Sequence, residues 1–576
     1  MNKVALLLLS LILPFSAFSK DKVCSHVYIH GDEIDLTDTE KQLVCGDKKV
    51  DAYKDIPTYQ ASFYLTGFLQ SRGYLQPEFK TENDVLHTYV GKKTYVKKIK
   101  VLSDLEKENA FVSSELKRLY RGKLLTTSEL NSIEAEAHSI IRQRGYPCSK
   151  VISEVNAKSG TVTVQLQRMA FFNFGEVDKE KIPGLRDNAL ERYYPFYAEE
   201  AFNEDLLRLT EKRMTRSEVV QGTYFLENCS EDLKSFSMEQ RFIVGPPRTI
   251  RFGAGASTEV GPMARIKWSN NRSKSMASLL SASLEGSFRS QSLNLMADSF
   301  VWKSSPRRSI LSQAQVTRDS QYDFEQVVYS LKSQVKWTND IGNHQSVYSL
   351  GPGYETGTYS SSNSSDTKSF ATGLILGSVQ FTSHGYELFD IHPEEGDTFG
   401  ASFDFRHPSM GFSDPLLKLE TTAAKLWRLM NSGRGTIVGG VRFNAGTTWV
   451  SDDLGLKGLP PAVKFFGGGS DDTRGYLIKT LPKNDGLGAL TKVGIKLELR
   501  RTYLWKETIE AFTFVDSAYF GDQSWDLQNQ LWYSPGIGVR WLSPIGLVQA
   551  YGARALSMNP YEDNGNFFYA GFGGVF

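Results

Sequence analysis

From about residue 251 onward, short segments of the chain alternate apolar and polar residues. In residues 493–500 the odd positions are apolar and the even positions are glycine or charged, and residues 436–449 and 536–541 show the same alternation. A period of two places apolar side chains on one strand face and polar side chains on the other. Charged residues hold the polar face in one segment after another, which favours a membrane barrel with a wet lumen over a soluble sandwich.

The length of this region predicts the number of strands. Residues 251–576 are about 326 residues, and roughly 20 residues for each strand and its connection give about 16 strands. We therefore predict a 16-stranded antiparallel transmembrane β-barrel over residues 249–576, with residues 451–492 as one long loop.

The part of the chain before the barrel contains a repeat. Residues 67–74 and residues 140–146 both end in Arg-Gly-Tyr, and residues 219–224 form a looser third copy. The second copy ends an apolar stripe at helical spacing, and strand-like segments follow it. We predict three α+β units over residues 20–94, 95–170 and 171–248, each a helix pair with strands.

Composition agrees with an exported protein. The chain of 576 residues has 66 basic and 65 acidic residues, so its charge gives no indication of nucleic-acid binding. An apolar run, Val4–Phe15, follows Lys3 and precedes small residues, which predicts a signal peptide over residues 1–19. No later segment has the 18 or more apolar residues that a membrane helix requires.

The cysteines and histidines leave two interpretations open. Cys24 and Cys45 lie in one small unit with little core, and an oxidising compartment permits a disulfide between them. The alternative is unpaired buried thiols. Cys24, His26 and His30 would share a strand face, but we favour a disulfide with two surface histidines over a metal site. The sequence gives no pairing for Cys148 and Cys229.

Motifs for catalysis are missing from the sequence. It contains no Gly-x-Ser-x-Gly, His-Glu-x-x-His or Gly-x-x-x-x-Gly-Lys segment. We therefore expect no enzyme activity, no cofactor and no metal.

The most informative motif lies in the predicted long loop. Residues 465–476 read Phe-Phe-Gly-Gly-Gly-Ser-Asp-Asp-Thr-Arg-Gly-Tyr, and residues 534–546 read Ser-Pro-Gly-Ile-Gly-Val-Arg-Trp-Leu-Ser-Pro-Ile-Gly. These segments resemble the outer-membrane assembly and two-partner secretion superfamily. The three N-terminal units resemble polypeptide-transport-associated (POTRA) domains, which stand in the periplasm. Within the superfamily, this layout is most similar to the outer-membrane subunit of the translocation and assembly module (TamA-like).

The resemblance implies a charge clamp inside the barrel. Arg474 on an inward-folded loop would be held by Glu498 and Asp516, and a guanidinium fork suits two carboxylates. Periodicity alone instead favours a solvated extracellular loop for Arg474. Parity also places Phe512 and Phe514 on the face of Asp516, which leaves room for a β-bulge. The other residues that the resemblance implies are the tip residues Gly475 and Tyr476 and the loop glycines Gly467, Gly468 and Gly469.

The last residues resemble the C-terminal signal of outer-membrane barrels. Tyr569, Gly571 and terminal Phe576 match that pattern, whereas Gly574 departs from it, since a large apolar residue is usual there. The first strand, about 252–258, and the last, 567–576, would meet at a seam. Glycines in the closing strand would weaken the pairing across it.

The resemblance also implies a function and partners. A TamA-like protein assists insertion of outer-membrane and autotransporter clients through the seam. Its partner would be an inner-membrane-anchored, periplasm-spanning (TamB-like) subunit docked on the first POTRA-like unit. A two-partner secretion transporter that exports one protein through the lumen is the main alternative, although that class usually has two such units. Lipid transfer and a purely structural barrel also remain open.

Overall fold

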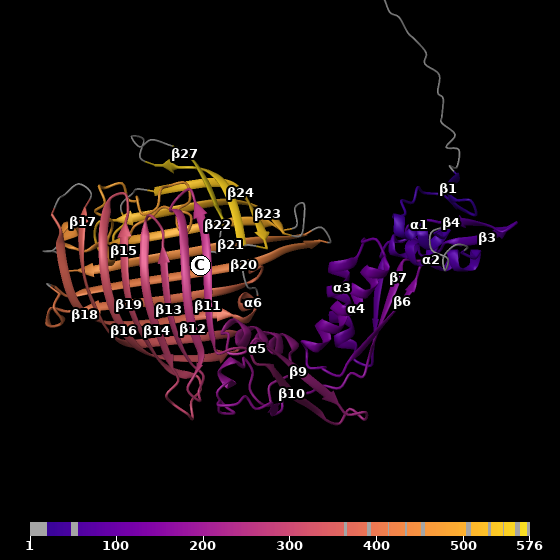
Figure 1. Ribbon diagram of the computed structural model, residues 1–576, viewed down its shortest axis with the longest axis horizontal. Helices are drawn as coiled ribbons and strands as arrows, with labels where there is room; N and C mark the ends of the chain where they lie inside the picture. The colour runs from indigo at the N-terminus through magenta and orange to yellow at the C-terminus, as the bar shows by residue number, and fades with distance from the viewer. Residues whose placement is uncertain are drawn as a thin grey trace, which may run out of the picture. The chain divides into compact units, whose positions relative to one another are not determined.

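The computed structural model describes residues 20–47, 56–361, 366–388, 393–412, 414–432, 435–450, 455–502, 508–527, 531–544, 546–558 and 565–572. These residues form two compact units. The first contains residues up to Phe172 together with 201–203 and 231–233, and the second contains the remainder, including the whole barrel (Figure 1). The predicted signal peptide, residues 1–19, lies outside the described residues.

The first POTRA-like unit is a four-stranded sheet with two helices. Its elements are β1 (Lys20–Cys24), β2 (Val27–His30), α1 (Asp38–Cys45), α2 (Thr58–Ser71), β3 (Glu78–Glu82) and β4 (Val85–Tyr89). The strand order is β1-β2-β4-β3. Ala61, Leu65 and Leu69 recur at a spacing of four on α2 and are fully buried in the core. Thr37 caps α1 through a hydrogen bond from the Glu40 N–H, and Glu40 bonds back to Thr37.

The second unit repeats this plan. Its elements are β5 (Lys98–Leu102), α3 (Glu106–Tyr120), α4 (Thr127–Arg142), β6 (Lys150–Asn156) and β7 (Thr161–Gln167), with strand order β5-β7-β6. The predicted apolar stripe on α4 is buried: Ile133, Ala137 and Ile141 have no exposed surface. These residues pack on β7, so the helix pair covers one face of the sheet.

The third unit departs from the predicted helix pair. Its elements are β8 (Val177–Lys179), the short 3-10 helix η2 (Glu191–Tyr193), α5 (Glu204–Arg216), β9 (Gly222–Cys229) and β10 (Phe236–Ile243). The prediction of two α-helices here was wrong, because Pro195 interrupts the region where the first helix would run. Phe196 beside it stacks on Phe174 at 4.0 Å between ring centroids, so aromatic packing fills the place of that helix.

Residues 248–572 form the closed antiparallel barrel that the alternation predicted. Its strands are β11 (Arg248–Ser257), β12 (Gly261–Ser273), β13 (Ser278–Gly286), β14 (Ser290–Ser299), β15 (Arg308–Ser320), β16 (Phe324–Ile341), β17 (His344–Ser361), β18 (Lys368–Ser383), β19 (Gly396–Arg406), β20 (Leu416–Ser432), β21 (Gly435–Val450), β22 (Thr491–Arg501), β23 (Ile509–Gly521), β24 (Leu531–Ser543), β25 (Gly546–Arg554) with its continuation β26 (Leu556–Ser557), and β27 (Asn566–Phe572). Counting β25 and β26 as one strand gives the predicted 16 strands.

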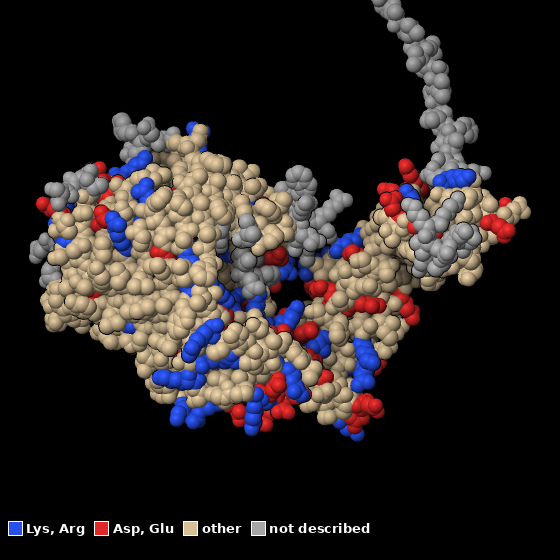
Figure 2. Space-filling model, in the orientation of Figure 1, with Lys and Arg blue, Asp and Glu red and all other residues tan. Residues whose placement is uncertain are grey.

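The two faces of the barrel wall differ in polarity. On β24 the apolar residues Ile537, Val539 and Trp541 are 69%, 50% and 47% exposed, whereas Arg540 between them points to the lumen and pairs with Glu498. The middle of the wall seen in Figure 2 carries few charged side chains. An apolar outer band is what a strand requires when it faces lipid. Within the described residues, no helix is long and apolar enough to cross a membrane.

The third POTRA-like unit is fastened to the barrel by buried charges. Arg213 of α5 pairs with Asp340 of β16 at 2.8 Å and with Glu387 at 2.6 Å. Glu387 belongs to α6 (His384–Glu387), the short helix between β18 and β19. Arg307 also reaches Asp340, whose side chain is 1% exposed. Separating α5 from β16 would leave buried charges without a partner, so these ion pairs oppose separation of the third unit from the barrel.

Candidate functional site

The long loop between β21 and β22 folds into the barrel. Its described part, residues 455–490, contains α7 (Gly455–Gly458), the 3-10 turn η4 (Pro461–Val463) and two isolated bridges, Phe465 with Ala489 and Gly467 with Leu481. Leu459, Val463, Leu481 and Ala489 have no exposed surface. These residues pack in two clusters with side chains of the barrel, the first containing Leu416 and Val450 and the second Phe520 and Trp532, and this packing holds the loop against the wall.

Arg474 at that tip is bound to two strands of the wall. Its backbone N–H and its Nε both donate to Oδ2 of Asp516 on β23, at 3.0 and 2.7 Å, and its Nη2 donates to Oδ1 at 2.8 Å. Its Nη1 donates to Glu498 on β22 at 2.8 Å. Asp516 is fully buried, and Arg474 is 7% exposed. The fork of guanidinium donors thus holds the loop to both strands at once.

Two phenylalanines complete the surroundings of Arg474. The guanidinium carbon lies 3.6 Å from the ring centroid of Phe514, and Arg540 stacks on Phe512 at 3.9 Å. Both rings point into the lumen because β23 pairs with β22 in continuous register, with no bulge between Thr491 and Arg501. The β-bulge that the sequence suggested is therefore absent from this strand pair. Inward aromatic rings instead serve as cation–π partners for the arginines.

Glu498 is shared between two arginines. Arg540 of β24 donates to it at 2.7 and 3.0 Å, in addition to the bond from Arg474. Sequence alternation placed Arg540 on the lumenal face, but it gave no indication that Arg540 would pair with Glu498. Two cations and two carboxylates consequently form one balanced network across β22, β23 and β24.

Gly475 and Tyr476 press the tip against the wall. A Cβ at Gly475 would lie 2.2 Å from Oγ of Ser534 on β24, and the residue has φ +96°, so no side chain fits there. The Tyr476 hydroxyl donates to the carbonyl of Leu556 on β26 at 2.6 Å. The tip therefore also contacts the strands next to the end of the barrel.

The three loop glycines lie in a tight backbone turn. Gly467 exchanges hydrogen bonds with Leu481 at 2.8 and 3.0 Å, Gly468 donates to Asp472 at 2.9 Å, and Gly469 donates to the Tyr476 carbonyl at 2.9 Å. Asp472 pairs in turn with Lys492 of β22 at 2.7 Å. This second ion pair, which sequence reasoning missed, holds the base of the turn.

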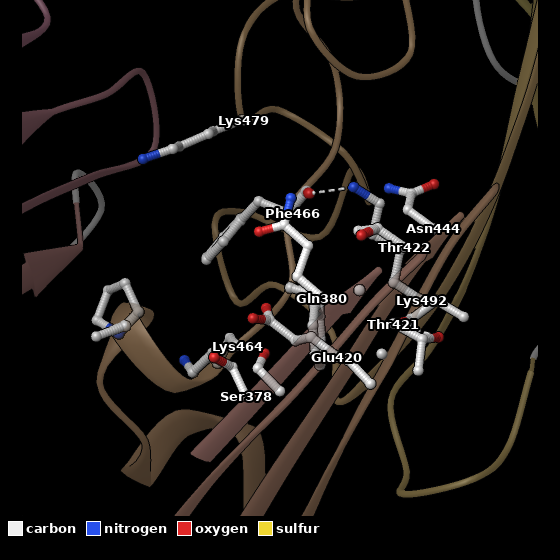
Figure 3. Close-up of a pocket in the computed structure, with 18 of the residues that line it drawn as sticks. Ser378, Gln380, Glu420, Thr421, Thr422, Asn444, Lys464, Phe466, Lys479 and Lys492 are labelled. Carbon is white, nitrogen blue, oxygen red and sulfur yellow. Dashed lines mark hydrogen bonds between the residues drawn. The ribbon is translucent and has the colours of Figure 1, made fainter. Parts of the chain in front are cut away.

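Beside the loop the lumen keeps a polar cavity of about 660 Å³. The cavity is lined by polar side chains of β18, β20 and β21, such as Gln380, Glu420 and Asn444, and by Lys464 and Lys479 of the loop (Figure 3). Lys492 donates to the Phe466 carbonyl at 2.8 Å at one side of this space. The loop thus occupies part of the lumen and leaves a cavity next to β18–β21.

The two ends of the barrel, β11 and β27, meet in a seam, and residues 573–576 of the closing segment lie outside the described residues. Within the described part of β27, only Ala256 with Phe572 and Ser257 with Gly571 are paired with β11, and Thr258 adds a bond to the Ala570 carbonyl at 2.9 Å. On its other edge β11 pairs with β12 over its whole length, Arg248–Ser257. Tyr569 is 8% exposed and stacks on Tyr551 at 4.9 Å inside the barrel. Phe576 lies outside the described residues.

In the first POTRA-like unit, Cys24 and Cys45 form a disulfide. Cys148 and Cys229 are disulfide-bonded as well. Cys24 and His30 belong to the three residues that the sequence placed on one strand face as a conceivable metal site. Cys24 is taken up by the disulfide, and the His30 ring stacks on His87 with Nε2 of His30 3.0 Å from Nδ1 of His87.

Residues 265–576 match the Omp85 superfamily domain. The chain belongs to the Omp85 superfamily. One solved structure agrees in fold: BamA from Haemophilus ducreyi lacking POTRA domains 1–3 is 16% identical, with a TM-score of 0.50 over 83% of this chain and 99% of that chain. CdiB from Escherichia coli is 12% identical, with a TM-score of 0.47 over 90% of this chain and 97% of that chain.

Membership of this superfamily settles the class of the protein and its place in the cell. The barrel lies in the outer membrane, and the POTRA-like units stand in the periplasm. Omp85 proteins transport or insert polypeptides, and they act on unfolded outer-membrane clients together with partner components.

Proposed function

We propose that this Omp85 protein is the outer-membrane subunit of a translocation and assembly module, which helps barrel and autotransporter clients to insert through its seam. The observation that supports the proposal is the seam itself, where the two ends of the barrel, β11 and β27, pair at Ala256 with Phe572 and at Ser257 with Gly571 among the described residues. Each unpaired backbone group at a strand edge offers a hydrogen bond to an incoming strand. When β11 and β27 separate, their edges can therefore pair with a client strand.

The three POTRA-like units support the same proposal. Among the described residues the sheet of each unit has two edge strands, β1 and β3 in the first, β5 and β6 in the second, and β8 and β9 in the third. Such edges can hold an extended client by strand addition before it reaches the barrel. We further propose that the first unit, through the face built on β1–β4 and α2, binds a periplasm-spanning, inner-membrane-anchored (TamB-like) subunit.

A disulfide across the seam tests the gating step. Ala256→Cys with Phe572→Cys joins two paired residues, whereas a side chain at Gly571 would meet the Tyr569 hydroxyl at 2.6 Å. Ser312→Cys with Ser333→Cys is the matched control, because these residues pair within the continuous β15–β16 ladder. Under oxidation we expect the seam lock to stop assembly of an autotransporter client, with recovery on reduction, and the control lock to leave assembly unchanged.

Each outcome of this experiment has a definite meaning. Full client assembly by the oxidised seam variant would reject lateral insertion, and it would favour export through the lumen as in two-partner secretion. Full assembly together with altered lipid content of the outer membrane would favour lipid transfer. Heat-modifiable gel mobility of both variants checks that the barrels are folded.

A further inference from the structure

Glu259, in the turn between β11 and β12, is bound to the lumenal loop. Its Oε1 accepts from the Ser470 N–H at 3.1 Å, and its Oε2 accepts from the Ser470 hydroxyl at 2.8 Å. Glu259 is only 8% exposed although it lies in a two-strand turn. Within the turn, the Val260 N–H donates a hydrogen bond to the hydroxyl oxygen of Ser257, not to Glu259. The carboxylate is therefore directed at the loop and does not serve to build its own turn.

This contact attaches the loop to the opposite side of the seam from its anchors at Arg474 and Tyr476. Arg474 holds the loop to β22 and β23, and Tyr476 holds it to β26, all on the C-terminal side of the seam. Ser470, four residues before Arg474, holds it to the first hairpin. The loop consequently spans the seam on the lumenal side.

The loop backbone lies directly against Glu259, and a small cavity lies beside this contact. A Cβ at Gly469 would lie 2.7 Å from Oε1 of Glu259, so the loop backbone approaches the carboxylate directly. Next to this contact is a cavity of about 300 Å³, lined by Ser257, Glu259, Ser470, Tyr569 and Gly571 among others. First hairpin, loop and last strand therefore meet around one small space.

We propose that Glu259 is a positioning residue that couples the loop to the seam: its bond to Ser470 keeps the first hairpin closed against the last strand while the loop is clamped at Arg474. Release of either anchor then frees the hairpin. This inference deepens the proposed function, since it assigns a control element to the same seam, but the closure of the seam can be measured without any client.

The test uses oxidation of the Ala256→Cys, Phe572→Cys pair in the full-length protein in native membranes. Glu259→Ala is added, and Glu325→Ala serves as the control, because Glu325 is a partly exposed carboxylate paired with Arg318 on β15. We expect Glu259→Ala to slow disulfide formation across the seam by about fivefold, the population change expected from loss of one net hydrogen bond. The loop should also become more accessible to protease, and Glu259→Gln, which keeps an acceptor, should fall between.

A merely structural role would give a different pattern. If Glu259→Ala only destabilised the barrel, oxidation of the Ser312→Cys, Ser333→Cys pair and heat-modifiable mobility would decline in parallel, which would overturn the proposal. Unchanged seam oxidation and unchanged loop protection would overturn it as well. If Glu259→Ala loosens the seam but the seam lock leaves client assembly intact, the coupling stands and the proposed insertion function fails.

Discussion

The two carboxylates that bind Arg474 differ in their number of arginine partners. Asp516 is fully buried and receives three hydrogen bonds from Arg474, whereas Glu498 has Arg540 as a second cation. Loss of Arg474 therefore leaves Asp516 without an arginine partner and leaves Glu498 paired. The sequence resemblance pointed to Arg474, Glu498 and Asp516. It did not predict this difference between the two carboxylates, because the contacts of Arg540 and Phe514 depend on how the strands are paired.

Arg474→Ala should give a folded barrel with a mobile loop and reduced client assembly. Removing one partner of a buried pair costs on the order of 3–5 kcal/mol, less here because the lumen holds water. Lysine should rescue poorly, since a point charge cannot make the forked contact. Protease access within residues 465–485 reports the loop. Wild-type assembly with an equally protected loop in the alanine variant would contradict the clamp.

Asp516→Asn in the Arg474→Ala background provides the matched control. It removes the uncompensated carboxylate, so it should recover part of the thermal stability that Arg474→Ala loses, without restoring client assembly. Additive losses of stability would show that the two side chains act independently.

At the scale of elements, local patterning predicted more than long-range pairing. The period-two segments and the stripe on α4 became strands and a helix, because each pattern buries or exposes one face. The prediction from local patterning was wrong for the third POTRA-like unit, because the segment around Phe196 packs its aromatic rings in the core without forming an α-helix. Contacts of the inward loop could not be read from periodicity, because a loop has no repeating face.

The disulfide should stabilise the first POTRA-like unit. A 21-residue separation between Cys24 and Cys45 predicts about 2–4 kcal/mol from restriction of the unfolded chain. Replacing both cysteines by serine in the full-length protein should therefore raise the cleavage rate within residues 20–94 in limited proteolysis. Cleavage in the second unit, residues 95–170, is the internal reference. Equal protection of the first unit in both proteins would contradict this expectation.

The same unit should weaken in acid. The hydrogen bond from Arg72 lowers the pKa of Glu40 from 4.5 to about 2. The stabilisation is fully present above about pH 4.5 and is lost as the pH falls through about 2, since the unfolded state binds the proton first. Pepsin, active over this range, should cleave Glu40→Gln faster than wild type at pH 4.5, with the difference shrinking toward pH 2. Glu115→Gln, in an exposed pair with Arg118, should match wild type throughout.

At the scale of the whole molecule, two features meet at the seam. The two ends of the barrel pair there, and the lumenal loop is anchored on both sides of that pair. The closed barrel could be predicted from composition and alternation. Which two strands close the barrel could be expected from chain order, whereas the anchoring at Glu259 could not, because a single glutamate in a turn carries no sequence signal.

The most direct measurement is capture of a client strand during assembly. A single cysteine at Ala256 on β11, with a cysteine in the last strand of a barrel client, should give a mixed disulfide while the client is inserting. A cysteine at Ser312 on β15 should give none, and neither should one at Thr422, which lines the lumenal cavity. Capture at Ala256 alone is the result that lateral insertion predicts. Capture at Thr422 with none at Ala256 would show passage through the lumen and would contradict the account.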